Sequence, residues 1–364
     1  MEFSMLPIVV RLMATLMGSI ANTVMPPSDE AVLVFAGDAM QHQGQLDAAR
    51  RGNTFDYSQC FASVTPFISD ADYAVVNLET TLGESNFTGY PCFCSPDAYA
   101  QSLIDAGFDM FLTANNHTLD RLDRGHARTI HVLDSLGIDH IGTWRNSDER
   151  QRRLPFIRDI NGFKIAFLNY TYGTNGIKLK GDGVVDYIDR QLISDDIENA
   201  KKAGAEIIAA SIHWGVEYKL LPHPSQRSLA SFLRDNGVDL IIGGHPHVIQ
   251  PMELTDADST GRRILTVYSL GNFISNMRTT DTRGGAMVKV VLRRSTDGLP
   301  AVHSAEYALV FTVPAGSGQS NYRLYPIDSD SIPSAWRSRA SAFASSARRI
   351  FSAHNCNVEE VSAR

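Results

Sequence analysis

The chain has 364 residues, of which 43% are hydrophobic and 20% are charged, a composition typical of a soluble globular protein. Its formal net charge is −7 and no block of lysine and arginine stands out, which argues against a nucleic-acid partner. Four cysteines are too few for a disulfide framework in a chain of this length.

The N-terminal apolar segment, residues 1–30, allows two interpretations. Residues 6–20 are apolar but short for a membrane span, and Arg11 lies among them. Their apolar positions fit one helical face, which favours a packed or peripheral amphipathic helix, and so a cytoplasmic or membrane-peripheral protein. A signal or anchor is the alternative, because Ser19-Ile20-Ala21 faintly resembles a cleavage site. The protein would then be membrane-anchored or exported, and in either case residues 6–20 are the candidate for membrane association.

Short β-branched runs alternate with helical segments over residues 31–300, which predicts an α/β domain. Strands are predicted at 32–36, 73–78, 108–113, 164–169, 206–212, 238–242, 265–270 and 286–292. Helices are predicted at 95–107, 125–136, 195–203 and 224–236. Residues 301–364 read as a C-terminal extension that packs on this domain and ends in a helix over 334–352.

The stretch IIGGHPHVIQ, residues 241–250, carries two histidines directly after a predicted buried strand. Gly243 and Gly244 allow a sharp turn, which leaves His245 and His247 at the carboxyl end of the strand. Imidazole is the commonest metal ligand in proteins, and ligands of open α/β sheets bind at this edge. This stretch alone leaves two interpretations open, a metal site and a polar loop that binds nothing.

Other strand ends also deliver polar side chains, and this repetition favours a metal site. In chain order the further candidates are Asp38, Asn77 with Glu79, Asn116 with His117, and His213. A mixed set of oxygen and imidazole ligands suits Mn, Fe or Zn, and we expect one or two divalent ions. Two ions that share a carboxylate bind a phosphate-like group and activate water near neutral pH.

Residues 114–120, ANNHTLD, place amides, an imidazole and a carboxylate in one turn. An amide oxygen can ligate a metal, and His117 can act as a general acid if Asp120 orients it. An Asx-turn with a helix cap is the structural alternative, but it accounts for one asparagine only. The charged positions from Arg121 to Arg128 are further candidates for substrate contact.

Six motifs in this order resemble the CapA family, the poly-γ-glutamate and capsule synthesis proteins of the calcineurin-like metallophosphatase superfamily. The resemblance spans roughly residues 31–290. The motifs are Gly37-Asp38-x-Met40, Asn77-Leu78-Glu79, Ala114-Asn115-Asn116-His117-x-x-Asp120, His213-Trp214-Gly215-x-Glu217, His245-Pro246-His247-Val248-x-Gln250 and Ser269-Leu270-Gly271-Asn272-Phe273.

This resemblance implies a four-layer α/β/β/α sandwich with the site at one edge of the sheets. It implies that Asp38 and His247 hold one metal and that Glu79, or else Asn77, bridges two. It assigns the second metal to a set of three residues, Asn116, His213 and His245. His117 is then the general acid, with Asp120 behind it.

One position departs from the wider superfamily, which has Asp-x-His in the first motif where this chain has Met40. A thioether is a poor ligand for hard ions, so the first metal site is expected to be weakened, rescued or lost. His42 and Glu217 are the candidate substitutes, and Asn77 and Asn272 are further candidates for ligands or substrate contacts.

The resemblance implies a metallophosphatase-like hydrolase or transferase in poly-γ-glutamate or capsule polymer synthesis. The enzyme would act by metal-assisted chemistry on a phosphoryl or acyl-phosphate group, or on a γ-glutamyl chain. Two alternatives stay open, a non-catalytic partner that binds the polyanionic polymer or its synthase, and a plain phosphodiesterase. The expected partners are an anionic polymer or a phosphorylated small molecule, together with polymer synthase subunits.

Overall fold

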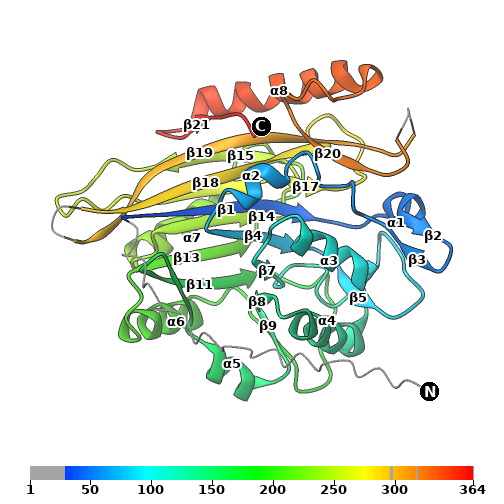
Figure 1. Ribbon diagram of the computed structural model, residues 1–364. Helices are drawn as coiled ribbons and strands as arrows, with labels where there is room; N and C mark the ends of the chain where they lie inside the picture. The colour runs from blue at the N-terminus through cyan, green and yellow to red at the C-terminus, as the bar shows by residue number, and fades with distance from the viewer. Residues whose placement is uncertain (1–28, 296–297, 317–318, 364) are drawn as a thin grey trace, which may run out of the picture.

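The computed structural model describes residues 29–295, 298–316 and 319–363, which form two stacked β-sheets flanked by helices (Figure 1). The amphipathic helix, signal or anchor expected in the N-terminal segment lies outside the described residues. Among the helices of the described residues, none is both long and apolar enough to cross a bilayer.

The first sheet has nine strands and combines a parallel half with an antiparallel half. Its main order is β20-β19-β18-β1-β4-β7-β8, with β17 paired to β1 and β21 paired to β19. The parallel strands are β1 (Glu30–Ala39), β4 (Tyr73–Leu78), β7 (Met110–Leu112) and β8 (Asp139–Ile141). The antiparallel strands are β18 (Gly284–Arg294), β19 (Pro300–Val313) and β20 (Arg323–Pro326).

The second sheet has six strands in the order β10-β11-β13-β14-β16-β15. Its four central strands are parallel, namely β11 (Phe163–Thr171), β13 (Ile207–His213), β14 (Leu240–Gly244) and β16 (Leu265–Leu270). Its edge strands are antiparallel, namely β10 (Phe156–Ile160) and β15 (Ile249–Leu254). Both sheets therefore bring the carboxyl ends of several parallel strands to one edge.

The hydrophobic core has three layers, and these define the fold class. One cluster fills the space between the sheets, where Phe35 and Val75 meet Phe167 and Ile242. A second cluster packs helices on the outer face of the first sheet, and a third packs helices on the outer face of the second sheet. Those helices are α2 (Thr65–Ser69), α3 (Asp97–Asp105) and α4 (Leu122–Leu136) on the first sheet, and α6 (Arg190–Lys202) and α7 (Pro224–Asp235) on the second. The predicted four-layer α/β/β/α sandwich is confirmed.

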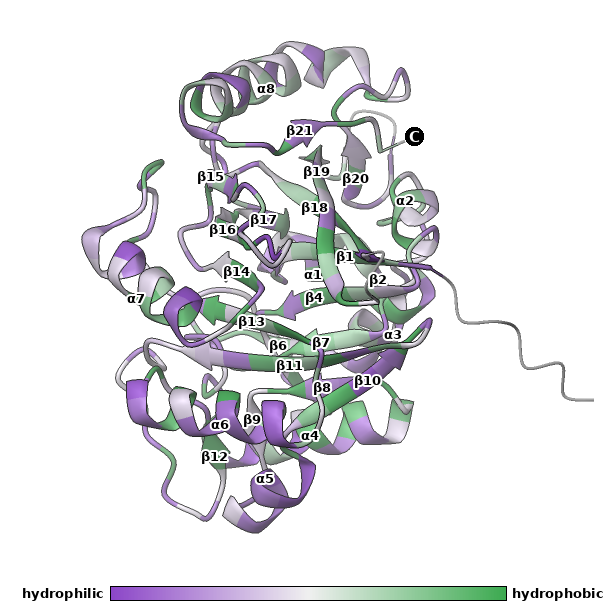
Figure 2. Ribbon diagram, turned by 90° about the vertical axis from the view of Figure 1, so that its left-hand side faces the viewer, coloured by the Kyte–Doolittle hydropathy of each residue, from purple (hydrophilic) through white to green (hydrophobic). Residues whose placement is uncertain are grey.

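The C-terminal part of the chain adds strands to the first sheet and packs a helix against the second. β19 pairs with β18 along its length, so the first sheet continues past residue 300. Helix α8 (Ser334–His354) lies across the edge formed by β15 and β19 and places Phe343 and Phe351 in the core between the sheets. Figures 1 and 2 both show α8 on the side of the molecule opposite α5 (Ser147–Arg153) and α6.

The short elements serve mainly as connections. They are α1 (Gln43–Ala49), β2 (Arg50–Arg51), β3 (Thr54–Phe55), β5 (Thr81–Gly83), β6 (Cys94–Pro96), β9 (Thr143–Trp144), β12 (Val184–Val185), β17 (Asn272–Ile274) and β21 (Glu359–Glu360). Helix α6 begins five residues before the predicted start, because the Asp189 side chain accepts a hydrogen bond from the Leu192 backbone N–H and caps the helix there.

Candidate metal centre

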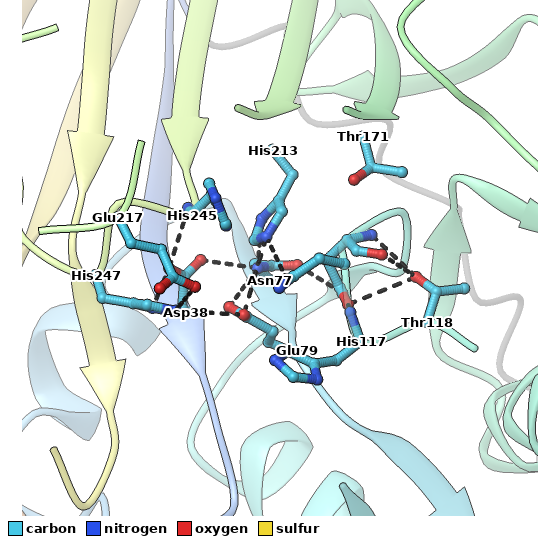
Figure 3. Close-up of polar contacts among 12 residues, drawn as sticks. Asp38, Asn77, Glu79, His117, Thr118, Thr171, His213, Glu217, His245 and His247 are labelled. Atoms are coloured by element: carbon cyan, nitrogen blue, oxygen red, sulfur yellow. Dashed lines mark hydrogen bonds and ion pairs between the residues drawn. The ribbon is translucent and has the colours of Figure 1, made fainter. Parts of the chain in front are cut away.

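Strands of both sheets end at one cluster of polar side chains, which Figure 3 shows pointing toward one another. In the first sheet Asp38 of β1 lies in register with Asn77 of β4 and with Asn272 of β17. In the second sheet His213, the last residue of β13, lies in register with Gly244 of β14. The edge predicted from the strand ends is therefore where these side chains meet.

The backbone around the site has two unusual features, a close contact at Gly37 and positive φ angles at His245 and His247. A Cβ atom on Gly37 would lie 2.0 Å from the carbonyl oxygen of Gly271, so only glycine lets β1 and β17 meet beside Asp38. His245 and His247 have φ angles of 98° and 58°, which non-glycine residues rarely adopt. Such strain costs about 1–3 kcal/mol per residue and is typical of functional sites.

A first group of ligand atoms comes from Asp38, Glu79 and His213, which lie within 4.8 Å of one another. Both carboxylates are fully buried. The Asn77 side-chain amide lies between them and donates hydrogen bonds to Asp38 Oδ1 at 2.8 Å and Glu79 Oε2 at 3.4 Å. The Asn116 Oδ1 atom lies 2.9 Å from His213 Nε2, so the predicted amide ligand is at the same place.

The electrostatics of this first group fit a cation. Burial alone would raise the pKa of Asp38, but the hydrogen bond from His247 and the charges of His213 and His247 lower it below its usual range. Burial, together with the nearby charge of Asp38, raises the pKa of Glu79 well above its usual range. Among the described residues Glu79 Oε1 is buried without a hydrogen-bond partner. A divalent ion would neutralise both carboxylates and ligate that oxygen atom.

A second group consists of Glu217, His245 and His247, whose ligand atoms also lie within 4.8 Å of one another. Burial, then the proximity of His247, lowers the pKa of His245 to about 3, so the ring is neutral at physiological pH. A neutral imidazole is the form that binds metal. His245 Nδ1 is buried and lacks a hydrogen-bond partner within the part of the chain that the structure describes, as a metal-ligating nitrogen would.

His247 joins the two groups. Its Nδ1 lies 3.4 Å from Asp38 Oδ2, and its Nε2 lies 3.8 Å from Glu79 Oε1 and 3.9 Å from Glu217 Oε1. Asn272 Oδ1 lies 3.1 Å from the same Nδ1 and orients the ring. Carboxylate, amide and imidazole donors in two adjoining groups suit one or two ions of Mn, Fe or Zn.

A histidine–carboxylate pair lies beside these ligands. His117 Nδ1 is 2.7 Å from Asp120 Oδ2, and both side chains are buried. The Phe93 backbone N–H donates to the same Asp120 oxygen at 2.6 Å, and the Phe93 ring packs edge-on against His117 at 4.6 Å between centroids. This arrangement fixes the orientation of the His117 ring, as general acid catalysis requires.

Glu217 and His42, the candidate substitutes for the histidine that Met40 replaces, differ in their position relative to the ligand groups. Glu217 is a member of the second ligand group, whereas His42 belongs to neither group. His42 precedes α1, and its Nδ1 accepts a hydrogen bond from the Asn276 backbone N–H at 3.2 Å. Met40 is buried, and its carbonyl oxygen accepts hydrogen bonds from Gln45 and Tyr99.

Sequence reasoning missed several aromatic residues around the site. Phe93 follows no predicted strand, and no sequence signal places it against His117. Tyr172 packs against His245 with ring centroids 4.5 Å apart, and Tyr218 packs against His247 at 6.2 Å. Tyr172 belongs to the hydroxyl-rich loop 170–176, whose composition is a weak signal of substrate contact.

The structure is a helix-flanked double sheet with candidate metal ligands at its strand ends. The family model described as "Bacterial capsule synthesis protein PGA_cap" matches residues 32–277, more than half of the chain. The chain belongs to this family.

Two curated relatives are described as capsule or PGA biosynthesis proteins. The chain is 26% identical over 277 residues to the capsule biosynthesis protein CapA of Bacillus anthracis, covering 73% of this chain and 65% of that protein. It is 29% identical over 244 residues to the PGA biosynthesis protein CapA of Bacillus subtilis (strain 168), covering 65% of this chain and 62% of that protein. The chain thus matches slightly less than two thirds of the length of these relatives.

Two solved structures are also similar. The NAD nucleotidase NadN of Haemophilus influenzae has a TM-score of 0.49 and 12% identity, covering 91% of this chain and 64% of that one. The sulfate thiohydrolase SoxB of Thermus thermophilus has a TM-score of 0.42 and 14% identity, covering 91% of this chain and 62% of that one.

Proposed function

We propose that this chain is a metal-dependent hydrolase or transferase of capsule or poly-γ-glutamate production, acting on a phosphoryl, acyl-phosphate or γ-glutamyl group. The observation that carries the proposal is the meeting of the two ligand groups, joined by His247, next to the oriented His117–Asp120 pair. Buried polar atoms are usually hydrogen-bonded, and the lack of such a partner for Glu79 Oε1 and His245 Nδ1 among the described residues supports metal ligation.

The side chains of the site have two proposed roles, holding the metal and donating a proton. A divalent ion bound here supplies Lewis-acid activation of water and stabilises the charge of the transition state. Asp38, Glu79 and His213 would hold it where strand ends of both sheets meet, and Glu217 with His245 and His247 would complete the set. His117 gives a proton to the leaving group while Asp120 holds the ring in place. The anionic polymer, or a phosphorylated precursor of it, is the proposed partner, along with synthase subunits.

The non-catalytic alternative is favoured by one observation, the buried Met40 in place of a histidine ligand. In that case the inherited site would bind the polymer or its synthase without turnover. Glu217 weighs against this alternative, because it supplies a carboxylate to His245 and His247.

Elemental analysis tests the metal centre first. Protein purified without chelator or affinity metal should hold about two equivalents of Mn, Fe or Zn, and His245→Ala should lose at least one. His117→Asn should keep its metal, because His117 lies outside both ligand groups. Wild-type protein without metal, even after incubation with each ion, would refute the proposal.

Turnover is the second test. Metal-loaded protein is assayed with γ-linked glutamate chains, with acyl phosphates and with chromogenic phosphate esters. We expect His117→Asn to lower the rate by about 100-fold or more at unchanged metal content. Equal rates in wild type and His117→Asn would remove the general acid from the mechanism. Turnover of generic esters alone would favour a plain phosphodiesterase.

A further inference from the structure

A cavity of about 190 Å³ is lined by Arg121 and Cys94, which follow Asp120 and Phe93 in the chain, and by none of the metal ligands. It is enclosed by β5 and the loop that follows it, by Cys94, and by the first turns of α4. Two chain segments link the cavity to the site. One residue separates Glu79 from β5, and Arg121 directly follows Asp120. The Phe93 N–H contacts Asp120, which contacts His117, so the cavity walls at Cys94 and Arg121 are one residue removed from the His117–Asp120 pair.

The cavity is positively charged. Three arginines line it, Arg121, Arg124 and Arg128, whereas Glu84 is the one acidic residue in its wall. Glu84 pairs with Arg124 at 3.1 Å and approaches Arg128 at 3.7 Å. Arg128 also pairs with Asp97 of α3 at 2.7 Å, outside the cavity lining.

Arg121 forms no ion pair with any of the described residues. Its Nη2 donates to two neutral oxygen atoms, the Asn86 carbonyl at 2.8 Å and the Thr88 hydroxyl at 2.7 Å. Burial raises the pKa of the Cys94 thiol, so this neighbour is neutral and brings no negative charge. The charge of Arg121 is thus left for a ligand to neutralise.

Two of the arginine donors are also unsatisfied. Arg121 Nε and Arg128 Nη1 are buried and lack a hydrogen-bond partner in the described ranges. Buried donors are nearly always hydrogen-bonded in folded proteins, and those to charged acceptors form the strongest bonds. Because arginines line the cavity, an anionic ligand would satisfy these donors.

We propose that this cavity, called here the arginine pocket, binds a free α-carboxylate of a γ-linked glutamate chain whose neighbouring unit lies at the metal centre. The inference rests on the proposed function and adds a substrate subsite to it. The planar fork of arginine matches the two oxygen atoms of a carboxylate, and such a chain carries one carboxylate per unit. Ligand pockets usually measure about 300–1,000 Å³, so this smaller cavity suits a single acidic group.

The test is isothermal titration calorimetry of the full chain with short synthetic γ-linked glutamate oligomers, in metal-loaded and chelator-treated protein. We expect Arg121→Gln to weaken binding by about tenfold, because it removes a charged donor from a partly buried site. Arg124→Gln should weaken it by about threefold, because its side chain is 87% exposed. Glu84→Gln should tighten binding, since it removes the competing carboxylate.

Arg152→Gln is the matched control, because it removes the same charge from an exposed position on α5. Near-ultraviolet circular dichroism and the thermal midpoint show that each variant is folded. Affinities of the pocket variants equal to that of Arg152→Gln would overturn the inference, as would wild-type protein that binds no oligomer. A γ-linked isoglutamine oligomer, whose α-carboxylates are amides, that binds as tightly, or inorganic phosphate that competes equally well, would overturn the carboxylate assignment.

These outcomes are separable from those of the proposed function. If wild type holds metal and turns over substrate while the arginine variants bind oligomer normally, the subsite alone is refuted. If the arginine variants lose affinity in a protein that never takes up metal, the subsite is supported and the proposed function is refuted.

Discussion

Glu217 supplies a carboxylate to the second ligand group and differs from the other ligands in its exposure. Its side chain is 42% exposed, whereas His247 opposite it is buried. We predict that Glu217→Gln lowers the metal content from about two equivalents to about one, because a neutral amide is a weaker ligand than a carboxylate.

Elemental analysis of the purified variant measures this change. Glu198→Gln is the control, because Glu198 is an exposed residue of α6 that pairs with Lys201. Two equivalents in both variants would show that Glu217 does not substitute for the histidine replaced by Met40.

His42 gives the protein a predictable response to acid. Burial, then the proximity of His247, lowers its pKa to about 4, and its Nδ1 accepts the Asn276 N–H only while that nitrogen is unprotonated. The unfolded chain binds this proton at about pH 6.5. Between pH 6.5 and 4 the unfolded state therefore holds more protons, so the free energy of unfolding decreases as the pH falls through this window.

We predict that His42→Asn shows a weaker loss of stability between pH 7 and about 4 than wild type, by up to about 3 kcal/mol. Asparagine keeps an acceptor before α1 but does not titrate. Urea unfolding of chelator-treated protein at several pH values measures the effect without metal release. Parallel pH profiles for the two proteins would show that His42 is not buried in its neutral form. Part of the slope will remain, because burial also lowers the pKa of His245.

At the scale of elements, Arg150 of α5 joins two segments beneath the second sheet. It pairs with Asp186, just after β12, and with Asp196 of α6, and both carboxylates are buried. Trp144 and Tyr170 donate to the same two carboxylates at 2.8 Å and 2.7 Å. Burial raises the pKa of Asp186 to about 6 although Arg150 opposes the shift, so the cation is what keeps the carboxylate charged.

We predict that Arg150→Met lowers the free energy of unfolding by about 3–5 kcal/mol at pH 8, because it leaves two buried carboxylates unpaired. The deficit should shrink as the pH falls from 8 toward about 6, because loss of Arg150 raises the pKa of Asp186 further and its carboxyl takes up a proton first in the variant. Arg152→Met, an exposed change on the same helix, should cost less than about 0.5 kcal/mol. Urea denaturation measures both, and equal midpoints would mean that the ion pairs are not required for stability.

Eight strands, among them β4 and β16, could be predicted because they are short apolar runs, most of which end at a polar residue, whereas β8, β10, β15, β19 and β20 could not. β4 has the predicted bounds, and Asp38, His213 and His247 meet as expected because parallel strands end at one edge. Contacts between residues distant in the sequence could not be predicted. Phe93 reaches His117, and Arg150 reaches Asp196, only through the packing of the whole fold.

At the scale of the whole molecule, the C-terminal segment holds the two sheets together. The core between the sheets is continuous from Phe35 of β1 to Ile242 of β14, and α8 covers it at the edge of β15 and β19. After α8, the Asn355 side chain accepts the Met252 N–H of β15 at 2.8 Å, and β21 pairs with β19 of the other sheet. Both sheets should therefore unfold in one transition, although the metal centre lies at strand ends elsewhere in the fold.

Phe343 of α8 tests whether α8 and the two sheets unfold together. It is 1% exposed, its ring centroid lies 6.1 Å from that of Phe311, and its ring reaches within 2.6 Å of a Cβ position on Gly284. We predict that Phe343→Ala lowers the free energy of unfolding by about 3–5 kcal/mol through loss of buried surface and an unfilled cavity. Ser345→Ala, an exposed change two residues along, should be within about 0.5 kcal/mol of wild type.

Far-ultraviolet circular dichroism and tryptophan fluorescence should report the same lowered urea midpoint for Phe343→Ala, because α8 and both sheets share one core. If the fluorescence of Trp336 on α8 changed well before the circular dichroism, α8 would be a separately unfolding cover rather than part of the sandwich.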